Sequence, residues 1–284
     1  MSPVAVVTDS AADLAPAVAQ EYGITVVPLV VTFGSQTFKA GVDLSTEQFW
    51  ERMTAADAPF PTTAASAPGD FKAAYDACFA DGADAIVSIH VAGSLSGTIK
   101  SAQIARDLLP DREIHIIDSQ GASMAEAILA QMAVEMARMG VAAAEIARVL
   151  ETRVPDLRMF VVLETLEYLK KGGRISGTQA AIGTFLSVKP IIRVIAGVVE
   201  TADRVRTRSK ARERCIELIC ERPIERIAIL HTISPDVDAF RAEVLGRAPG
   251  GIDPAQVQVG LVGPSVGPHL GPGCLGAAVL YRAG

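Results

Sequence analysis

Short runs of β-branched residues alternate with alanine-rich segments through the first half of this chain. The runs with the length and composition of buried strands are 4–8, 24–33, 85–91 and 113–118. The segments with the spacing of one-sided helices are 13–22, 70–81, 98–109 and 122–139. Because strands that alternate with helices form βαβ units, this half of the chain predicts a mostly parallel sheet.

A hairpin and a capped helix are predicted after the second of these strands. "TFGSQTF" (32–38) is typical of two strands joined by a turn at Gly34–Ser35. Ser45 can accept a hydrogen bond from the first turn of a helix, and Gln48 can return one to the backbone. We therefore expect a helix that begins after Ser45.

The second half of the chain predicts a different sheet. A helix at 143–153 ends before Pro155, so we place a boundary there between an N-terminal domain, 1–155, and a C-terminal domain, 156–284. The later strands are expected at 158–163, 188–195, 225–231 and 257–262, and the later helices at 177–187, 207–221 and 236–246. The turn at Ala196–Gly197 joins two apolar runs, which makes the second sheet mixed. The prediction is a two-domain α/β protein.

Composition excludes several classes of function. The chain has 284 residues, of which 50% are hydrophobic and 20% charged, which is ordinary globular composition. Its net charge is −6 and its 26 basic residues are scattered, so a nucleic-acid partner is not expected. The four cysteines form no CxxC pair, which indicates reduced thiols in the cytoplasm and no metal site. No nucleotide-binding or zinc-peptidase motif, signal peptide or membrane span is found.

One turn between a strand and a helix concentrates hydroxyl groups. "VAGSLSGTIKSA" (91–102) contains Ser94, Ser96 and Thr98. A nucleophile elbow needs serine at the centre of G-x-S-x-G, but Leu95 occupies that centre. The glycines, hydroxyls and free N–H groups of this stretch can bind an anion or simply cap the helix. The stretch alone leaves both interpretations open.

Other polar turns can meet at the same edge of the sheet. Thr63 lies in the turn "PTTAASAPGDF" (61–71), and the first strand ends in Thr8-Asp9-Ser10. Ligands of open α/β sheets collect at the carboxyl ends of strands, which favours one shared crevice. Arg174 follows the glycine pair that ends a helix, and His269 lies in the glycine-rich and proline-rich run 262–276. The other three histidines lie in apolar runs, as core histidines do.

The order of these segments resembles the DegV family over essentially the whole chain. The matching motifs are "VTDSAADL" (7–14), "PTTAASAPGDF" (61–71), "SLSGTIKSA" (94–102), "IIDS" (116–119), "LETLEYLKKGGRIS" (163–176), "KPII" (189–192) and "HLGPGCLG" (269–276). The resemblance implies a protein without a cofactor that holds a long-chain fatty acid between two domains. It also implies a separate, ATP-dependent fatty acid kinase subunit that phosphorylates the carboxylate.

The resemblance also assigns residues to the head group. Thr63 and Ser96 match the family's carboxylate ligands, and His269 and Arg174 match its supporting histidine and arginine. We expect Ser94 and Gly97 to complete this site.

The chain departs from the family pattern beside both carboxylate ligands. Ala64-Ala65-Ser66-Ala67 replaces a usual Ser-Gln-Pro-Ser, and Ala92-Gly93 replaces a usual pair of serines. Two hydroxyls and an amide are thus missing near the expected head group. We expect Ser66 and Ser94 to substitute in part.

Two other functions remain open at this point. Ser96 and His269 could form a serine-dependent esterase or acyl transferase, or the site could bind another anionic lipid or a phosphorylated small molecule. Ile182, Phe185 and Leu186 are candidates to line the acyl tail, with plain core packing as the alternative. Lys170 and Lys171 are candidates for docking the kinase subunit, with helix C-capping as the alternative.

Overall fold

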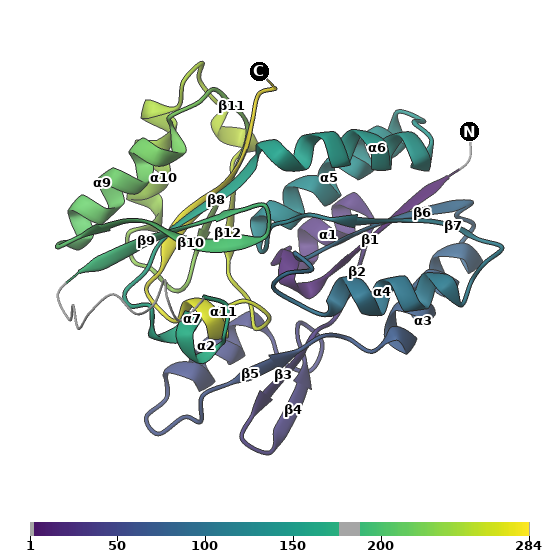
Figure 1. The fold of residues 1–284 in the computed structure, drawn as a ribbon, viewed down its shortest axis with the longest axis horizontal. Helices are drawn as coiled ribbons and strands as arrows, with labels where there is room; N and C mark the ends of the chain where they lie inside the picture. Colours follow the sequence, from purple (N-terminus) through teal and green to yellow (C-terminus); the bar gives the residue numbers. More distant parts are fainter. Residues whose placement is uncertain (1–2, 176–187, 284) are drawn as a thin grey trace.

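The computed structural model describes residues 3–175 and 188–283. Its first sheet has four parallel strands in the order β2-β1-β6-β7. These strands are β1 (Val4–Asp9), β2 (Ile24–Val27), β6 (Ala85–His90) and β7 (Glu113–Asp118). The predicted parallel sheet is confirmed, and Figure 1 shows it on the side of the molecule that carries the N-terminus.

Helices cover both faces of this sheet. One face is packed by α3 (Pro68–Ala80) and α4 (Thr98–Asp107) through a buried cluster that includes Phe71, Tyr75 and Ile86. The other face is packed by α5 (Met124–Arg138) and α6 (Ala143–Arg153), and α1 (Pro16–Tyr22) contacts β2. Every residue of α5 from 124 to 134 is buried, because this helix lies between the two sheets (Figure 1).

The second sheet has six strands in the order β10-β9-β8-β13-β11-β12 and is mixed, as predicted. Its strands are β8 (Leu157–Val162), β9 (Lys189–Ile195), β10 (Val198–Val205), β11 (Ile224–His231), β12 (Gln258–Leu261) and β13 (Leu275–Tyr281). Only β11 and β12 are parallel. Its outer face is covered by α9 (Arg208–Ile219) and α10 (Val237–Arg247).

The sequence did not predict β13, although it lies near the centre of this sheet. Its residues "LGAAVLY" follow directly on the glycine-rich run, which obscures where a strand begins. Gly276 allows β13 to lie close to β8, because a Cβ at this position would lie 2.0 Å from the carbonyl oxygen of Phe160. The turn at Ala196–Gly197 is confirmed, and both residues have positive φ.

The single strand expected at 24–33 is wrong, because the chain forms two strands there. After β2, Pro28 interrupts the strand, and β3 (Val30–Phe33) joins a separate antiparallel sheet in the order β4-β3-β5. Proline has no N–H group to donate to a ladder, and the next N–H, from Leu29, donates to the Ser10 hydroxyl. The other strands of this sheet are β4 (Gln36–Lys39) and β5 (Thr62–Ala64).

The remaining elements are short or agree with expectation. The capping box at Ser45 and Gln48 starts α2 (Thr46–Thr54), as predicted. The helix expected from residue 13 begins only at Pro16, because Asp13 has a left-handed φ of 53°. Short elements near the site are the 3₁₀ turn Ser10–Ala12, α7 (Glu167–Lys171) and α11 (Gly267–Leu270). Two further 3₁₀ turns span Val154–Asp156 and Pro254–Gln256.

The helix expected at 177–187, with Ile182, Phe185 and Leu186, lies outside the described residues. The domain boundary at 155 stays a prediction, and the largest buried cluster contains residues from both sides of it. Among the described helices, none has the length and apolar character needed to cross a membrane.

Candidate functional site

An apolar cavity of about 60 Å³ lies where the loops of the two sheets meet. Val91 follows β6 of the first sheet, and Met159 and Ile192 belong to β8 and β9 of the second. The residues that line it are Ala11, Leu29, Thr63, Val91, Leu95, Ser96, Ala122, Met159, Leu169, Arg174, Ile192, Val194, Val199, Ser265, Val266, His269 and Leu270.

Four residues that the sequence analysis selected line this cavity together. They are Thr63 on β5, Ser96 before α4, Arg174 after α7 and His269 on α11. These residues lie up to 206 positions apart in the chain. The convergence of the hydroxyl turns on one crevice, which the sequence analysis expected, is therefore present at Thr63 and Ser96.

Each ring nitrogen of His269 has a close neighbour. Its Nε2 lies 3.0 Å from Thr63 Oγ1. Its Nδ1 is buried without a hydrogen-bond partner among the described residues and lies against Gly172. A Cβ at Gly172 would lie 2.1 Å from that nitrogen, so only glycine fits at the end of α7.

The charge at this end of the cavity belongs to Arg174 and not to His269. Burial, helped by the positive charge of Arg174, lowers the pKa of His269 from 6.5 to about 4. Burial also lowers the pKa of Arg174, but a guanidinium remains charged in proteins. Arg174 donates from Nε to Leu95 O at 3.2 Å and from Nη1 to Gly172 O at 2.5 Å. A neutral imidazole and a guanidinium thus lie side by side.

Ser96 is the hydroxyl that reaches the cavity from the start of α4. Its Oγ lies 2.8 Å from Thr98 Oγ1 and accepts a hydrogen bond from Thr98 N at 3.3 Å. This local pattern also satisfies the first turn of the helix, so the anion-binding and capping interpretations are both compatible with it.

The structure does not bring Ser94 and Gly97 to the cavity wall. The Ser94 hydroxyl donates to the Gly197 carbonyl at 2.5 Å, and Gly97 is the N-cap of α4. Ser66 is buried, and its hydroxyl donates to the Pro28 carbonyl at 2.7 Å. Ser94 and Ser66 therefore do not replace the missing hydroxyls, since each already stabilises a loop.

The sequence analysis did not select one polar residue that lines the cavity. Ser265 lines it, and its hydroxyl lies 2.8 Å from that of Ser10 at the end of β1. The rigid run 262–276 was noticed for His269 alone. The signal that could have identified Ser265 is that it is the one hydroxyl in that run.

Ser96 and His269 are not arranged as a nucleophile and its base. The described hydrogen bonds join Ser96 to Thr98 and His269 to Thr63. No described carboxylate bonds to His269 Nδ1, which a hydrolase triad would use to orient the ring. The geometry therefore does not favour the esterase interpretation.

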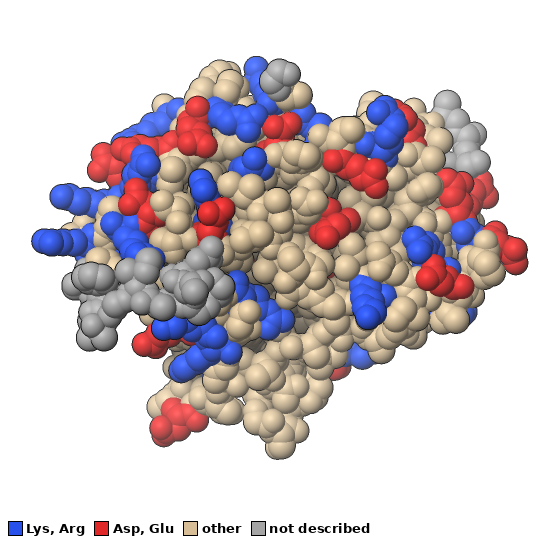
Figure 2. All heavy atoms as spheres, in the orientation of Figure 1, with Lys and Arg blue, Asp and Glu red and all other residues tan. Residues whose placement is uncertain are grey.

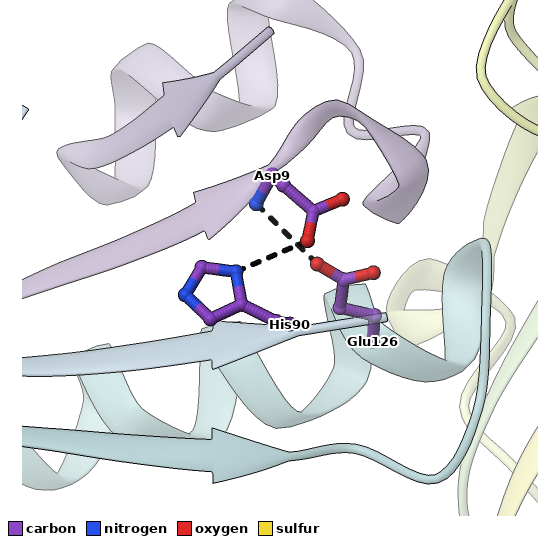
Figure 3. A group of neighbouring side chains, drawn as sticks. All are labelled: Asp9, His90 and Glu126. Atoms are coloured by element: carbon purple, nitrogen blue, oxygen red, sulfur yellow. Dashed lines mark hydrogen bonds and ion pairs between the residues drawn. The ribbon is translucent and has the colours of Figure 1, made fainter. Parts of the chain in front are cut away.

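A second polar cluster lies at the carboxyl ends of β1 and β6 in the first sheet. Asp9, His90 and Glu126 are fully buried, and each offers a ligand atom within 4.8 Å of the others (Figure 3). His90 Nδ1 bonds Asp9 Oδ2 at 3.0 Å, and Glu126 Oε1 accepts from the Thr8 hydroxyl at 2.6 Å. Asp9 Oδ2, His90 Nδ1 and Glu126 Oε1 are thus already engaged in hydrogen bonds, whereas Glu126 Oε2 has no partner among the described residues. His90 is a core histidine, as expected.

The other two histidines are not fully buried. His115 lies 2.8 Å from Glu113 on the edge strand β7 and is partly exposed. His231, at the end of β11, is half-buried and accepts from Ser234 N at 3.3 Å. The expectation of core histidines is therefore wrong for His115, because its strand forms the edge of the sheet.

These features define a class: an α/β protein with two main sheets and an apolar cavity that is lined by two hydroxyls, a neutral histidine and an arginine. The family model described as "Uncharacterised protein, DegV family" matches residues 3–282. This chain belongs to the DegV family.

Relatives of similar length cover the whole chain. A DegV domain-containing protein of Streptomyces coelicolor is 34% identical over 98% of this chain and 99% of its own length. Protein DegV of Bacillus subtilis is 30% identical over 98% of this chain and 99% of its own length.

Solved structures share the fold of this chain, and some of these proteins are described by the fatty acid that they bind. A DegV family protein of Thermus thermophilus, described by its fatty acid binding, superimposes with a TM-score of 0.89 at 31% identity, over 99% of this chain and all of the other. A stearic acid-binding protein of Eubacterium ventriosum gives 0.87 at 25% identity, over 99% of this chain and 98% of the other.

Proposed function

We propose that this chain binds a long-chain fatty acid in the cavity, with the carboxylate at Thr63, Ser96, Arg174 and His269. The observation that carries the proposal is that these four polar residues line one cavity, whose other lining residues are apolar except for Ser265. The fatty acid binding described for the relative of known structure from Thermus thermophilus supports it.

The chemistry of the cavity suits an amphiphile with an anionic head. Burying a methylene contributes roughly 0.8 kcal/mol, so about a dozen contribute ~10 kcal/mol before the cost of association is subtracted. A buried carboxylate needs hydrogen bonds or a cation. Thr63 and Ser96 can donate hydrogen bonds, and Arg174 supplies positive charge. The tail thus sets affinity and the head group sets orientation.

Extraction of the purified protein tests this proposal. Denaturation followed by mass spectrometry is expected to release close to one long-chain fatty acid per chain. The delipidated protein is then expected to bind oleate or palmitate in an isothermal titration. A protein that carries no fatty acid and binds neither probe would refute the proposal.

We further propose that the bound carboxylate is the substrate of a separate, ATP-dependent kinase subunit. The carboxylate oxygen would attack the γ-phosphorus of ATP, forming an acyl phosphate and releasing ADP. This chain would supply no catalytic group and no cofactor, and it would act in the cytoplasm without inserting stably into a membrane. Its part is to bury the tail and keep the head group oriented.

Basic side chains beside the cavity support a docking role. Lys170 and Lys171 end α7, and Lys171 Nζ lies 5.4 Å from the centre of the Phe60 ring. Lys and Arg side chains lie over this part of the face in Figure 2. Replacing both lysines with glutamate is expected to slow acyl phosphate formation by the kinase subunit and leave oleate affinity unchanged. An unchanged rate would exclude this surface.

Competition separates the fatty acid from other anionic ligands. The alternative is a site for another anionic lipid or a phosphorylated small molecule, which the same hydroxyls and arginine could bind. Lysophosphatidic acid and inorganic phosphate are suitable competitors against bound oleate. Displacement of oleate by either one at equal or lower concentration would favour the alternative.

A further inference from the structure

The segment that carries His269 is attached to the first domain through a few polar contacts. It runs from Val262, after β12, to the end of α11 at Leu270. The Ser265 hydroxyl bonds that of Ser10, and the Gly263 N–H donates to Asp13 Oδ1 at 2.8 Å. Both partners belong to the turn that follows β1, so residues 250 and 255 positions apart position one another.

Asp13 makes two hydrogen bonds that join different elements. Its Oδ1 accepts from Gly263, and its Oδ2 accepts from the Ser123 hydroxyl at 2.6 Å, at the start of α5. Asp13 itself has a φ of 53°, a conformation that aspartate, asparagine and glycine adopt more readily than other residues. This backbone conformation places the Asp13 carboxyl group between α5 and the segment 262–270.

The contact between Asp13 and Gly263 requires a close approach of the two chains. A Cβ at Gly263 would lie 3.0 Å from Asp13 Oδ1 and 3.3 Å from Thr46 Oγ1. A side chain here would therefore require Asp13, Thr46 or the segment to shift by a few tenths of an ångström. The glycine lets the backbone N–H reach Asp13.

Backbone hydrogen bonds connect Gly263 to His269. The Gly263 carbonyl accepts from the N–H of Gly267 at 2.8 Å and of Val266 at 3.3 Å. The Val266 carbonyl in turn accepts from His269 N at 3.0 Å. Since α11 has only four residues, these bonds fix most of its backbone. A shift of Gly263 therefore moves the imidazole relative to Thr63.

We propose that Asp13 is a positioning residue of the head-group site, which fixes through Gly263 the segment that places His269 against Thr63. Asp13 does not line the cavity. It acts on the ligand only through the segment 262–270, and the Ser10–Ser265 contact supports the same placement. This role rests on the proposed fatty acid site, which His269 lines, but the placement of His269 can be measured without a ligand.

The positive φ of Asp13 determines which variants test the proposal. Alanine would strain this backbone, so its effect would mix two causes. Asp13→Gly removes the carboxylate without that strain, and Asp13→Asn keeps an oxygen that can accept from Gly263. The matched control is Asp253→Asn, which changes a carboxylate that accepts from a backbone N–H at 3.0 Å in a turn away from the cavity.

Two readouts are measured on each variant. The first is the titration of the His269 ring by NMR, assigned by its loss in His269→Gln; the charged group that faces this ring is Arg174. In Asp13→Gly we expect the midpoint to rise from about 4 by about one unit or more, because the ring leaves its buried position. The second readout is oleate affinity, which we expect to fall about tenfold.

The other variants sharpen the result. Asp13→Asn is expected to keep both values near wild type, and Asp253→Asn to leave them unchanged. If Asp13→Gly does not fold, Ser10→Ala is used instead, with a smaller rise of the His269 midpoint expected. A folded Asp13→Gly, or a folded Ser10→Ala in its place, with an unshifted midpoint would overturn the proposal. If the wild type binds no oleate, the proposed function fails, while the His269 titration still decides the role of Asp13.

Discussion

Two hydroxyls, Thr63 and Ser96, are expected to bind the head group directly. A hydrogen bond to a charged group contributes roughly 1.5–3 kcal/mol, so the double variant Thr63→Val, Ser96→Ala should weaken oleate binding about a hundredfold or more. The fold should persist, because Ser96 and Thr98 satisfy each other only locally.

Isothermal titration and circular dichroism measure these two outcomes. Thr62→Val is the matched control, since Thr62 is exposed on β5 and does not line the cavity. Wild-type affinity in the double variant would remove both residues from the head-group site.

Gly172 tests whether the close approach to His269 matters. Its φ is −75°, so alanine is compatible with the backbone, but the new Cβ would lie 2.1 Å from His269 Nδ1. We expect Gly172→Ala to displace the ring, weaken oleate binding and destabilise the fold by about 1–3 kcal/mol. Urea denaturation measures the free energy of unfolding.

Gly69 provides the control for this change. It lies in α3, and a Cβ there would contact nothing within 4 Å. Gly69→Ala should stabilise the protein by up to about 1 kcal/mol, because alanine is the better helix former. If the two variants behaved alike, the contact with His269 would not be tight.

At the scale of elements, a buried acid joins α5 to β1. Burial, helped by the charge of Asp9, raises the pKa of Glu126 well above 4.5. Glu126 Oε2 has no hydrogen-bond partner among the described residues. The side chain still joins α5 to β1, because its Oε1 accepts from Thr8.

Glutamine at this position mimics the neutral acid. We expect Glu126→Gln to change the free energy of unfolding by less than about 1 kcal/mol, and Glu126→Ala to cost about 2–4 kcal/mol. Infrared spectroscopy at neutral pH should show a protonated carboxyl band that Glu126→Gln removes. A large loss of stability in Glu126→Gln, without such a band, would mean that the acid is ionised.

At the same scale, the elements differ in how far local sequence determines them. The helices α2 and α6 begin or end where capping residues and Pro155 indicate. The run 24–33 divides at Pro28, and β13 was not predicted. Both differences arise because pairing with distant strands decides which apolar run becomes a strand.

At the scale of the whole molecule, two groups near the site give opposite dependences of stability on pH. His269 has a folded pKa of about 4 against 6.5 unfolded, so its contribution is full above pH 6.5 and is lost as pH falls through 4. Burial raises the pKa of Asp13 from 3.8 to about 7, so its contribution declines as pH rises from about 4 to 7.

Single variants should separate the two slopes. Relative to wild type, His269→Gln should lose about 3 kcal/mol of stability as pH rises from 4 to 7, because the rising contribution is gone. Asp13→Asn should gain about 4 kcal/mol over the same interval. Urea denaturation at several pH values measures both, and the difference from wild type cancels the other titrating groups. Parallel curves for all three proteins would contradict these assignments.

The sequence by itself determined the α/β class, the parallel and mixed sheets, and the family to which the chain belongs. These properties follow from hydrophobic periodicity and from motifs that are short and local. Only the tertiary structure decided that Thr63, Ser96, Arg174 and His269 share one cavity, and that Ser94 is turned to Gly197. Such placement depends on the packing of segments far apart in the chain, which no local pattern encodes.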